Sequence, residues 1–265
     1  MNSRHFSHFF AALAIFLGVL QVSHAGPVQS RVQAGGSVKI CIWPDYFGIT
    51  YRHPHTGVLS GLDIDLSAEL ARDLGVKPVY VDSSFQTLVA DLLGDRCDVA
   101  MFAVGKLKQR MEVLRFTRAY MASDIYGITV KGSRIVHEWA DIDKPGVLVA
   151  VQAGTFMEAV MGERLKQARM VMIKPPATRE RDLQAGRVDV FMTDYPYSHG
   201  LIENSGWASR IAPPQPFFVL PYAYAVKPGD DEWLKEVDQF VERIMKDGRL
   251  DAAGRRSGLT PLIAH

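Results

Sequence analysis

Short apolar runs alternate along the chain with longer segments in which apolar residues recur at helical spacing. Such a run is typical of a buried strand, and the helical spacing is typical of an amphipathic helix. The segment 44–57, rich in proline and glycine, is predicted as a loop. The first part of the chain therefore predicts a strand, a helix, a strand, a helix and a strand, at Val38–Trp43, Asp63–Leu74, Pro78–Asp82, Phe85–Leu93 and Cys97–Val104 in turn.

The same order of elements returns in the second part of the chain. A local sequence also recurs, since Arg96–Met101 resembles Arg187–Met192. Strand–helix–strand order implies parallel strands joined by right-handed crossovers. We therefore expect an α/β protein with two similar lobes, followed by an amphipathic helix at Asp231–Lys246. Strands of the second lobe are predicted at 147–151, 169–173 and 188–193, and helices at 154–167 and 179–185.

The N-terminal residues have the pattern of a secretory signal. Arg4 supplies a positive charge, an uncharged apolar run extends from Phe9 to Leu20, and small residues up to Ala25 precede Gly26. The run is shorter than the about 20 residues that a membrane-spanning helix needs. We therefore expect residues 1–25 to be a cleaved signal peptide and the mature protein to reach the periplasm.

Charge and composition exclude some classes of function. The chain has 30 Lys and Arg against 29 Asp and Glu, and signal cleavage would remove only Arg4. This balance argues against a nucleic-acid partner, because such proteins need a basic surface. The sequence shows neither metal-ligand spacing of Cys and His nor a Ser–His–Asp or Cys–His arrangement. We therefore predict no metal, no cofactor and no catalytic residue.

Two cysteines, Cys41 and Cys97, each lie beside a predicted strand. In an oxidising compartment the pair can form a disulfide. Two buried free thiols fit the same pattern, because free cysteine is among the most buried residue types. The sequence leaves both alternatives open, since a bridge requires Cα atoms within about 7 Å of each other.

Ligands of open α/β sheets bind outside the carboxyl ends of the strands, and two facing lobes would enclose a ligand by hinge closure. Arg110 offers a planar fork for a carboxylate, and Asp194 offers a carboxylate for an ammonium. The turn at Gly154 and Thr155 opens a predicted helix, whose N–H groups favour an anion. Other residues at strand ends are Trp43, Tyr46, Phe102 and Gly105, of which the aromatic ones would form apolar walls.

Each of these residues also has an ordinary structural role to weigh against binding. Arg110 could form a surface ion pair with Glu112, and Phe102 could be a core aromatic. Asp194 could cap a turn, and Gly154 could begin an ordinary helix. Only their common position at strand ends favours a binding site. A zwitterion with a carboxylate and an ammonium on one carbon would use all of the polar groups.

Several short motifs follow one another in an order that is typical of one family. They are GLDIDL at Gly61–Leu66, DVAM at Asp98–Met101, Gln109 with Arg110, FTRAY at Phe116–Tyr120, VQAGT at Val151–Thr155, GRVDV at Gly186–Val190 with Asp194, and KDGRL at Lys246–Leu250. Over roughly residues 37–258 the chain resembles the bacterial extracellular solute-binding proteins of family 3, which are receptors for polar amino acid ABC transporters.

The resemblance implies the two-lobe periplasmic-binding-protein type II fold, in which each lobe is a mostly parallel sheet flanked by helices. Two hinge crossings would separate lobe 1, residues 26–121 and 222–265, from lobe 2, residues 122–221. The resemblance also implies that Arg110 and Thr155 hold a ligand carboxylate and that Asp194 holds its α-ammonium. We expect a monomer whose partners are a small-molecule ligand and an ABC transporter permease in the inner membrane.

The chain departs from the family at three places that would face the ligand. Ala103, Gly105 and Leu107 stand on a loop where the family usually has Ser or Thr, so hydroxyl contacts are missing. Trp43 stands where many members have an Asp that binds a basic side chain, which argues against a lysine-type or arginine-type ligand. Ile49 stands where an aromatic residue is common. The expected ligand is an amino acid or another small carboxylate.

Two other functions stay open beside the transport receptor. Periplasmic cyclohexadienyl dehydratases resemble this family, and a general acid in such an enzyme would come from Asp45, Glu158 or His199. The pair Cys41 and Cys97 is similar to one in substrate-binding-like proteins associated with quinoprotein alcohol dehydrogenases. That resemblance would make the chain an accessory or sensory module of a periplasmic dehydrogenase.

Overall fold

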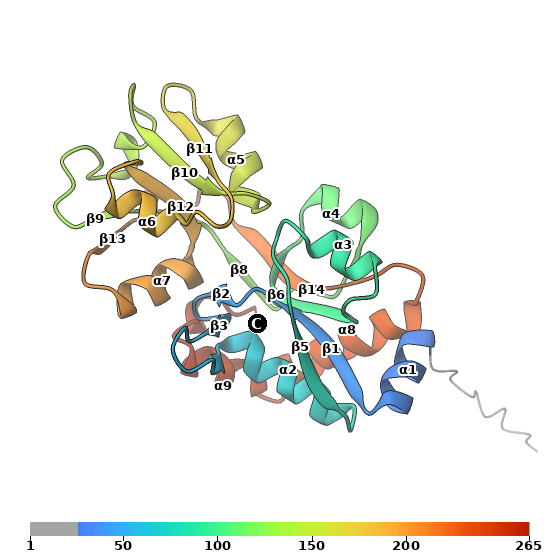
Figure 1. Ribbon diagram of the computed structural model, residues 1–265. Helices are drawn as coiled ribbons and strands as arrows, with labels where there is room; N and C mark the ends of the chain where they lie inside the picture. The colour runs from blue at the N-terminus through green and yellow to red at the C-terminus, as the bar shows by residue number, and fades with distance from the viewer. Residues whose placement is uncertain (1–25, 265) are drawn as a thin grey trace, which may run out of the picture.

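Two mixed β-sheets form the centres of two lobes in the computed structural model, which describes residues 26–264 (Figure 1). The predicted signal peptide lies outside the described residues. The first sheet has the order β5-β1-β6-β14-β7, and β8 also pairs with β14. Its strands are β1 (Ser37–Ile42), β5 (Lys77–Asp82), β6 (Val99–Gly105), β7 (Arg115–Phe116), β8 (Met121–Ser123) and β14 (Leu220–Val226).

The second sheet has the order β11-β10-β12-β9-β13. In each sheet three strands are parallel and antiparallel strands extend one side, which places the predicted strand–helix–strand repeat in both lobes. The central strands of both sheets appear in the sequence as apolar runs because helices cover them on both faces. In β6 of the first sheet, for example, every residue is buried. The strands are β9 (Ile125–Val130), β10 (Leu148–Gln152), β11 (Arg169–Ile173), β12 (Val190–Asp194) and β13 (Ala208–Ile211).

Helices cover both sheets, and no helix within residues 26–264 is long and apolar enough to cross a membrane. The predicted helix Asp231–Lys246 is present with the same bounds and buries an apolar stripe that includes Trp233 and Phe240. Around the first sheet lie α1 (Pro27–Gly35), α2 (Leu62–Asp73), α3 (Leu88–Leu93), α4 (Lys108–Val113), α8 (Asp231–Lys246), α9 (Arg249–Arg256) and η2 (Thr260–Leu262). With the second sheet lie η1 (Trp139–Asp141), α5 (Phe156–Arg164), α6 (Arg179–Gln184) and α7 (Tyr195–Asn204).

The segment predicted as a loop at 44–57 contains most of a small three-stranded sheet, so that prediction is wrong. Its strands β2 (Asp45–Tyr46), β3 (Thr50–Arg52) and β4 (Leu59–Ser60) are too short to show a hydrophobic period. Gly48 and Gly57 have φ values of 74° and 70°, which the turns between the strands require. The sheet holds Tyr46 at the end of β2, where the side chain is buried.

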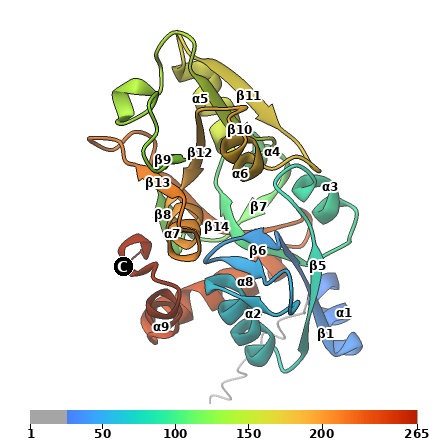
Figure 2. The same ribbon diagram turned by 60° about the vertical axis from the view of Figure 1, so that its left-hand side comes forward.

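The chain passes from the first sheet to the second between β8 and β9 and returns between β13 and β14 (Figure 2). At the first crossing, the Asp124 carboxylate accepts hydrogen bonds from the N–H groups of Ile125, Phe217 and Phe218, each at 2.7 Å. The two crossings are therefore tied to each other. The lobe limits at 121/122 and 221/222 stay a prediction.

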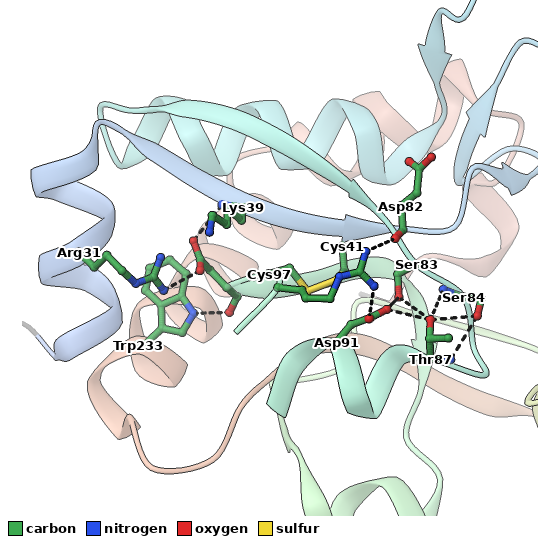
Figure 3. Close-up of a disulfide and its surroundings, with 12 residues drawn as sticks. Arg31, Lys39, Cys41, Asp82, Ser83, Ser84, Thr87, Asp91, Cys97 and Trp233 are labelled. Atoms are coloured by element: carbon green, nitrogen blue, oxygen red, sulfur yellow. Dashed lines mark hydrogen bonds and ion pairs between the residues drawn. A yellow bond between two sulfur atoms is a disulfide. The ribbon is translucent and has the colours of Figure 1, made fainter. Parts of the chain in front are cut away.

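Cys41 and Cys97 are joined by a disulfide, with their Cα atoms 5.5 Å apart, which resolves the two alternatives that the sequence left open. Figure 3 shows the bridge between β1 and the segment that precedes β6. Beside it, Asp91 of α3 accepts hydrogen bonds from Ser83 at 2.6 Å and Thr87 at 2.8 Å. These bonds fix the loop between β5 and α3, and that loop contains Phe85.

Candidate functional site

The carboxyl ends of the parallel strands in the two sheets face each other across a narrow cavity. Both lobes contribute to its wall, as expected for a cleft between α/β sheets. A wider cleft adjoins the cavity and shares Trp43, Phe85, Arg179 and Tyr197 with it. The inner cavity is lined by Trp43, Tyr46, Phe85, Ala103, Gly105, Thr155, Phe156, Met157, Arg179, Thr193, Asp194, Tyr197 and Tyr222.

Asp194 ends β12 with a buried carboxylate that is bonded to groups of both lobes. Its Oδ1 accepts a hydrogen bond from the N–H of Tyr197 at 3.1 Å, which caps α7. Its Oδ2 accepts one from the Tyr222 hydroxyl at 2.8 Å and another from the Tyr46 hydroxyl. Burial raises the pKa of Asp194, and these hydrogen bonds oppose that rise.

Arg110, on α4, is a buried cation that makes no ion pair within residues 26–264. Its guanidinium donates to the Gly105 carbonyl at 3.3 Å and to the Gly154 carbonyl of the other lobe at 2.8 Å. It also lies 5.3 Å from the ring centre of Phe85. Burial lowers the pKa of Arg110 to about 10, so the side chain stays charged at neutral pH. A buried and unpaired guanidinium is suited to a carboxylate.

The turn at Gly154 and Thr155 brings the start of α5 to the cavity. Thr155 is the N-cap residue, and its hydroxyl donates to the Gln152 carbonyl at 2.7 Å. Gly154 has a φ of 79°, and a Cβ atom there would lie 2.7 Å from the backbone nitrogen of Gln86 in the first lobe. Glycine therefore permits both the turn and the close approach of the two lobes.

Aromatic rings form most of the cavity wall. The rings of Trp43, Tyr46 and Phe85 lie with centres 5.2–5.8 Å apart. Trp43 is also stacked on Tyr197 of the second lobe, with ring centres 6.2 Å apart and planes 17° from parallel. Phe102 does not line the cavity; it is fully buried and supports Phe85 from behind at 5.1 Å. A ligand in the cavity would touch Phe85 instead.

Sequence reasoning did not identify six residues of the wall, which are Phe85, Phe156, Met157, Arg179, Thr193 and Tyr222. Phe85 lies shortly after β5, and no ligand-facing residue was predicted at the end of that strand or of β11. Tyr222 lies on β14, an antiparallel strand that does not belong to the predicted strand–helix repeat. Tyr197, which the sequence did place near a strand end, lies in the first turn of α7. Arg179 starts α6 with its guanidinium 4.5 Å from the ring centre of Tyr197. The family resemblance placed Tyr222 next to a crossing between the lobes but gave it no contact with a ligand.

The ionisable residues considered for a general acid lie apart from the inner cavity. Glu158 accepts a hydrogen bond from the Gly154 N–H at 2.8 Å, and His199 stacks on Tyr195. Asp45 lines only the outer cleft. Among the described residues, Asp194 is the one carboxyl group that lines the cavity. Residues 26–264 also contain no group of three or more His, Cys, Asp or Glu that could hold a metal ion.

The family model for bacterial extracellular solute-binding proteins, family 3, matches residues 38–257. The chain belongs to this family. Solved structures of amino acid-binding proteins have the same fold. One is an ancestral amino acid-binding protein described as a precursor of cyclohexadienyl dehydratase, with a TM-score of 0.78 at 24% identity, covering 86% of this chain and 98% of that one. Another is the L-arginine-bound AbpA of Streptococcus pneumoniae, with a TM-score of 0.77 at 22% identity, covering 89% and 100%.

Relatives of known function include both binding proteins and an enzyme. The cyclohexadienyl dehydratase of Pseudomonas aeruginosa is 28% identical over 251 residues, which cover 93% of this chain and 92% of that protein. The L-cystine-binding protein TcyJ of Escherichia coli K12 is 24% identical over 246 residues, which cover 92% and 91%. The family member described here thus has a fold that serves amino acid binding in most of these relatives.

Proposed function

We propose that this protein captures a small carboxylate, most simply an amino acid, between its two lobes and delivers it to an ABC transporter. The observation that supports this proposal is Arg110, a buried cation that makes no ion pair within residues 26–264 and that meets both lobes. A buried charge without a partner is costly, and a bound carboxylate would remove that cost. The membership of family 3 supports the same function.

The ligand carboxylate would dock on Arg110 at the edge of the first lobe. Closure would then bring the N-terminus of α5 with Thr155 onto the same group, where free N–H groups and the helix dipole favour an anion. An ammonium would bind Asp194 through Oδ1, which has one hydrogen bond from Tyr197, because Oδ2 already has two. Charge-assisted contacts in a cleft that excludes water are the strong ones.

The rest of the ligand would be apolar. Trp43, Phe85 and Phe156 surround the space next to Asp194, and Ala103 contributes only a methyl group. These walls favour an aliphatic or aromatic side chain, whereas a positively charged side chain would lose its hydration without a carboxylate of its own to pair with. We therefore expect a small apolar amino acid or a related carboxylate to bind more tightly than arginine or lysine.

A thermal-shift screen of the chain from Gly26 to His265 tests this function. The protein would be mixed with each common L-amino acid, small dicarboxylates and polyamines, and isothermal calorimetry would give Kd for each hit. A ligand at a hundredfold excess over Kd stabilises the folded state by about 2.7 kcal/mol. A shift with one apolar amino acid class supports the proposal. No shift with any compound contradicts it and would favour the accessory module of a dehydrogenase.

A second function is favoured by the 28% identity to a cyclohexadienyl dehydratase. Loss of water from such a substrate needs a general acid at the leaving hydroxyl, and the Asp194 carboxyl lies in the cavity with a raised pKa. The purified chain would be incubated with prephenate and arogenate, and the aromatic products measured. Turnover that disappears in Asp194→Asn would establish the enzyme, whereas binding without turnover would leave the receptor function.

A further inference from the structure

The motif Gly61–Leu66 places a carboxylate in the interior of the first lobe. Gly61 has a φ of 125°, and a Cβ atom there would lie 2.5 Å from the Ile49 carbonyl oxygen, so the chain can enter α2 at this angle only with glycine. Two residues later Asp63 has no exposed surface. It does not line the cavity, and the binding function proposed above gives it no role.

Three donors from separate segments of the first lobe surround the Asp63 carboxylate. Its Oδ2 accepts hydrogen bonds from the Ala103 N–H at 2.8 Å and the Tyr120 hydroxyl at 2.6 Å. Its Oδ1 accepts one from the Tyr224 hydroxyl at 3.0 Å. Within residues 26–264 no cation pairs with Asp63. The carboxylate is therefore held by neutral donors alone.

Ala103 lies in β6 at an irregularity in the pairing of this strand with β14. Its φ is 50°, a conformation that non-glycine residues rarely adopt. The pairing with β14 shifts at the same place, since Val104 lies opposite Ala223 but Ala100 lies opposite Ala225. The irregularity presents Ala103 to the cavity, and its N–H is bonded to Asp63. Asp63 thus stabilises a strained backbone at the ligand site.

The two tyrosines lie in the first lobe, next to the segments that connect the lobes. Tyr120 immediately precedes β8, and Tyr224 lies on β14. Their rings pack with centres 4.6 Å apart. One buried carboxylate therefore contacts the ligand-facing turn of β6 and two first-lobe segments that adjoin the crossings.

We propose that Asp63 is a positioning residue, whose ionised carboxylate holds the Ala103 turn against the hinge strands in the arrangement that binds ligand. This inference rests on the proposed binding function. When the carboxylate is protonated, one of its oxygens becomes a donor, so one of the three groups that face it loses its acceptor. The turn at Ala103 is the strained partner and is expected to relax first.

The titration of Asp63 falls in an accessible range. Burial raises its pKa to about 6, against the effect of the hydrogen bonds from Tyr120, Ala103 and Tyr224. The two tyrosines that face it have pKa values raised well above 10 by burial, so they stay neutral throughout. Because the folded state binds this proton more tightly than the unfolded state, the contribution to stability is present below pH 4 and is lost as the pH rises through 6. Ligand affinity should change in the opposite direction and fall below pH 6.

The amide resonance of Ala103 tests the inference without any ligand. In wild type its proton shift should titrate with a midpoint near pH 6 as the hydrogen bond to the carboxylate weakens. The midpoint should disappear in Asp63→Asn. In Tyr224→Phe, which leaves the Ala103 bond intact and removes a donor that lowers the pKa, it should move upward by several tenths of a pH unit. A flat Ala103 profile in folded wild type would overturn the inference.

Affinity provides the functional readout, with the L-amino acid that gives the largest thermal shift as the probe. Between pH 7 and pH 5 the wild-type Kd should rise roughly tenfold, the scale of one charge-assisted hydrogen bond. Asp63→Asn should bind weakly at both values. If affinity instead decreased as the pH rose through 6, in parallel with stability, Asp63 would have a merely structural role. If no amino acid binds wild type, the proposed function fails, and the Ala103 titration still decides the role of Asp63.

Discussion

The Tyr222 hydroxyl of the first sheet lies 2.8 Å from Oδ2 of Asp194 in the second sheet and donates a hydrogen bond to it. Tyr46 donates to the same oxygen from β2. Together with the bond from Arg110 to the Gly154 carbonyl, these contacts join the two lobes at the cavity. These inter-lobe hydrogen bonds therefore stabilise the closed cleft without a ligand. A ligand must compete with Tyr222 and Tyr46 for the Asp194 carboxylate.

The Arg110 guanidinium is expected to provide most of the affinity for a carboxylate. Arg110→Ala should weaken binding by about 2 kcal/mol or more, because it removes one partner of a buried charge pair. Calorimetry with the best ligand measures the loss. Lys108→Ala, an exposed position on the same helix, is the matched control and should leave Kd unchanged. Equal affinities for both variants and wild type would contradict the carboxylate assignment.

Asp194 and Tyr222 should change the preference for an ammonium in opposite directions. Asp194→Asn should weaken an amino acid more than its desamino analogue, because only the amino acid loses a charged partner. Tyr222→Phe frees an acceptor position on Oδ2 and should shift the ratio of the two Kd values toward the amino acid by severalfold. The test is a comparison of the two ratios. If both variants moved the ratio in the same direction, the ammonium would bind elsewhere.

Gly154→Ala should block closure without preventing folding. The added Cβ would meet the Gln86 backbone of the opposite lobe at 2.7 Å, and we expect at least a tenfold loss of affinity, about 1.4 kcal/mol. Gly186→Ala is the matched control, since Gly186 also has a positive φ, 67°, but its Cβ would have no neighbour within 4 Å. Both variants should lose about 1 kcal/mol of stability from backbone strain. An affinity loss shared by both would refute the steric explanation.

The disulfide should stabilise the first lobe more than it affects binding. It closes a loop of 56 residues between Cys41 and Cys97, for which the chain-entropy model gives about 4 kcal/mol. In urea denaturation, the double variant Cys41→Ala and Cys97→Ala should have a free energy of unfolding that is lower by about 4 kcal/mol. Its stability should no longer respond to reductant. Its Kd should stay within about threefold of wild type at 25 °C, because the folded loop keeps the Asp91 hydrogen bonds. A Kd loss comparable to that of Arg110→Ala would mean that the bridge positions Phe85.

The sequence predicted the fold well because the central strands are buried on both faces and show as apolar runs. It did not predict β2, β3 and β4, because two or three residues cannot show a period. The helix predicted from Phe85 starts only at Leu88, since Ser84 and Thr87 bond to each other and form a turn first. Local polar contacts of this kind have no signature in hydrophobic spacing.

The sequence predicted those residues of the candidate site that lie at the ends of parallel strands, but not those that long-range packing brings to the cavity. Residues at the ends of parallel strands, such as Trp43 and Asp194, follow from topology alone. Tyr222 lies on an antiparallel strand that returns from the far lobe, so its place depends on the packing of the whole chain. The backbone turn at Ala103 depends on a carboxylate forty residues away, which no local pattern indicates.

The stacking of Trp43 on Tyr197 should make the fluorescence of Trp43 sensitive to opening of the cleft. Opening of the cleft would separate the two rings and admit water to the indole of Trp43. Trp233, in contrast, is sealed in the first lobe, where its indole N–H is bonded to the Asp98 carbonyl at 2.8 Å. The emission of Trp43 should therefore shift to the red on opening, over the emission of the other three tryptophans, of which Trp233 should stay constant. Stopped-flow fluorescence could then follow the two lobes as they meet, in unlabelled protein and on the microsecond-to-millisecond scale of hinge motions.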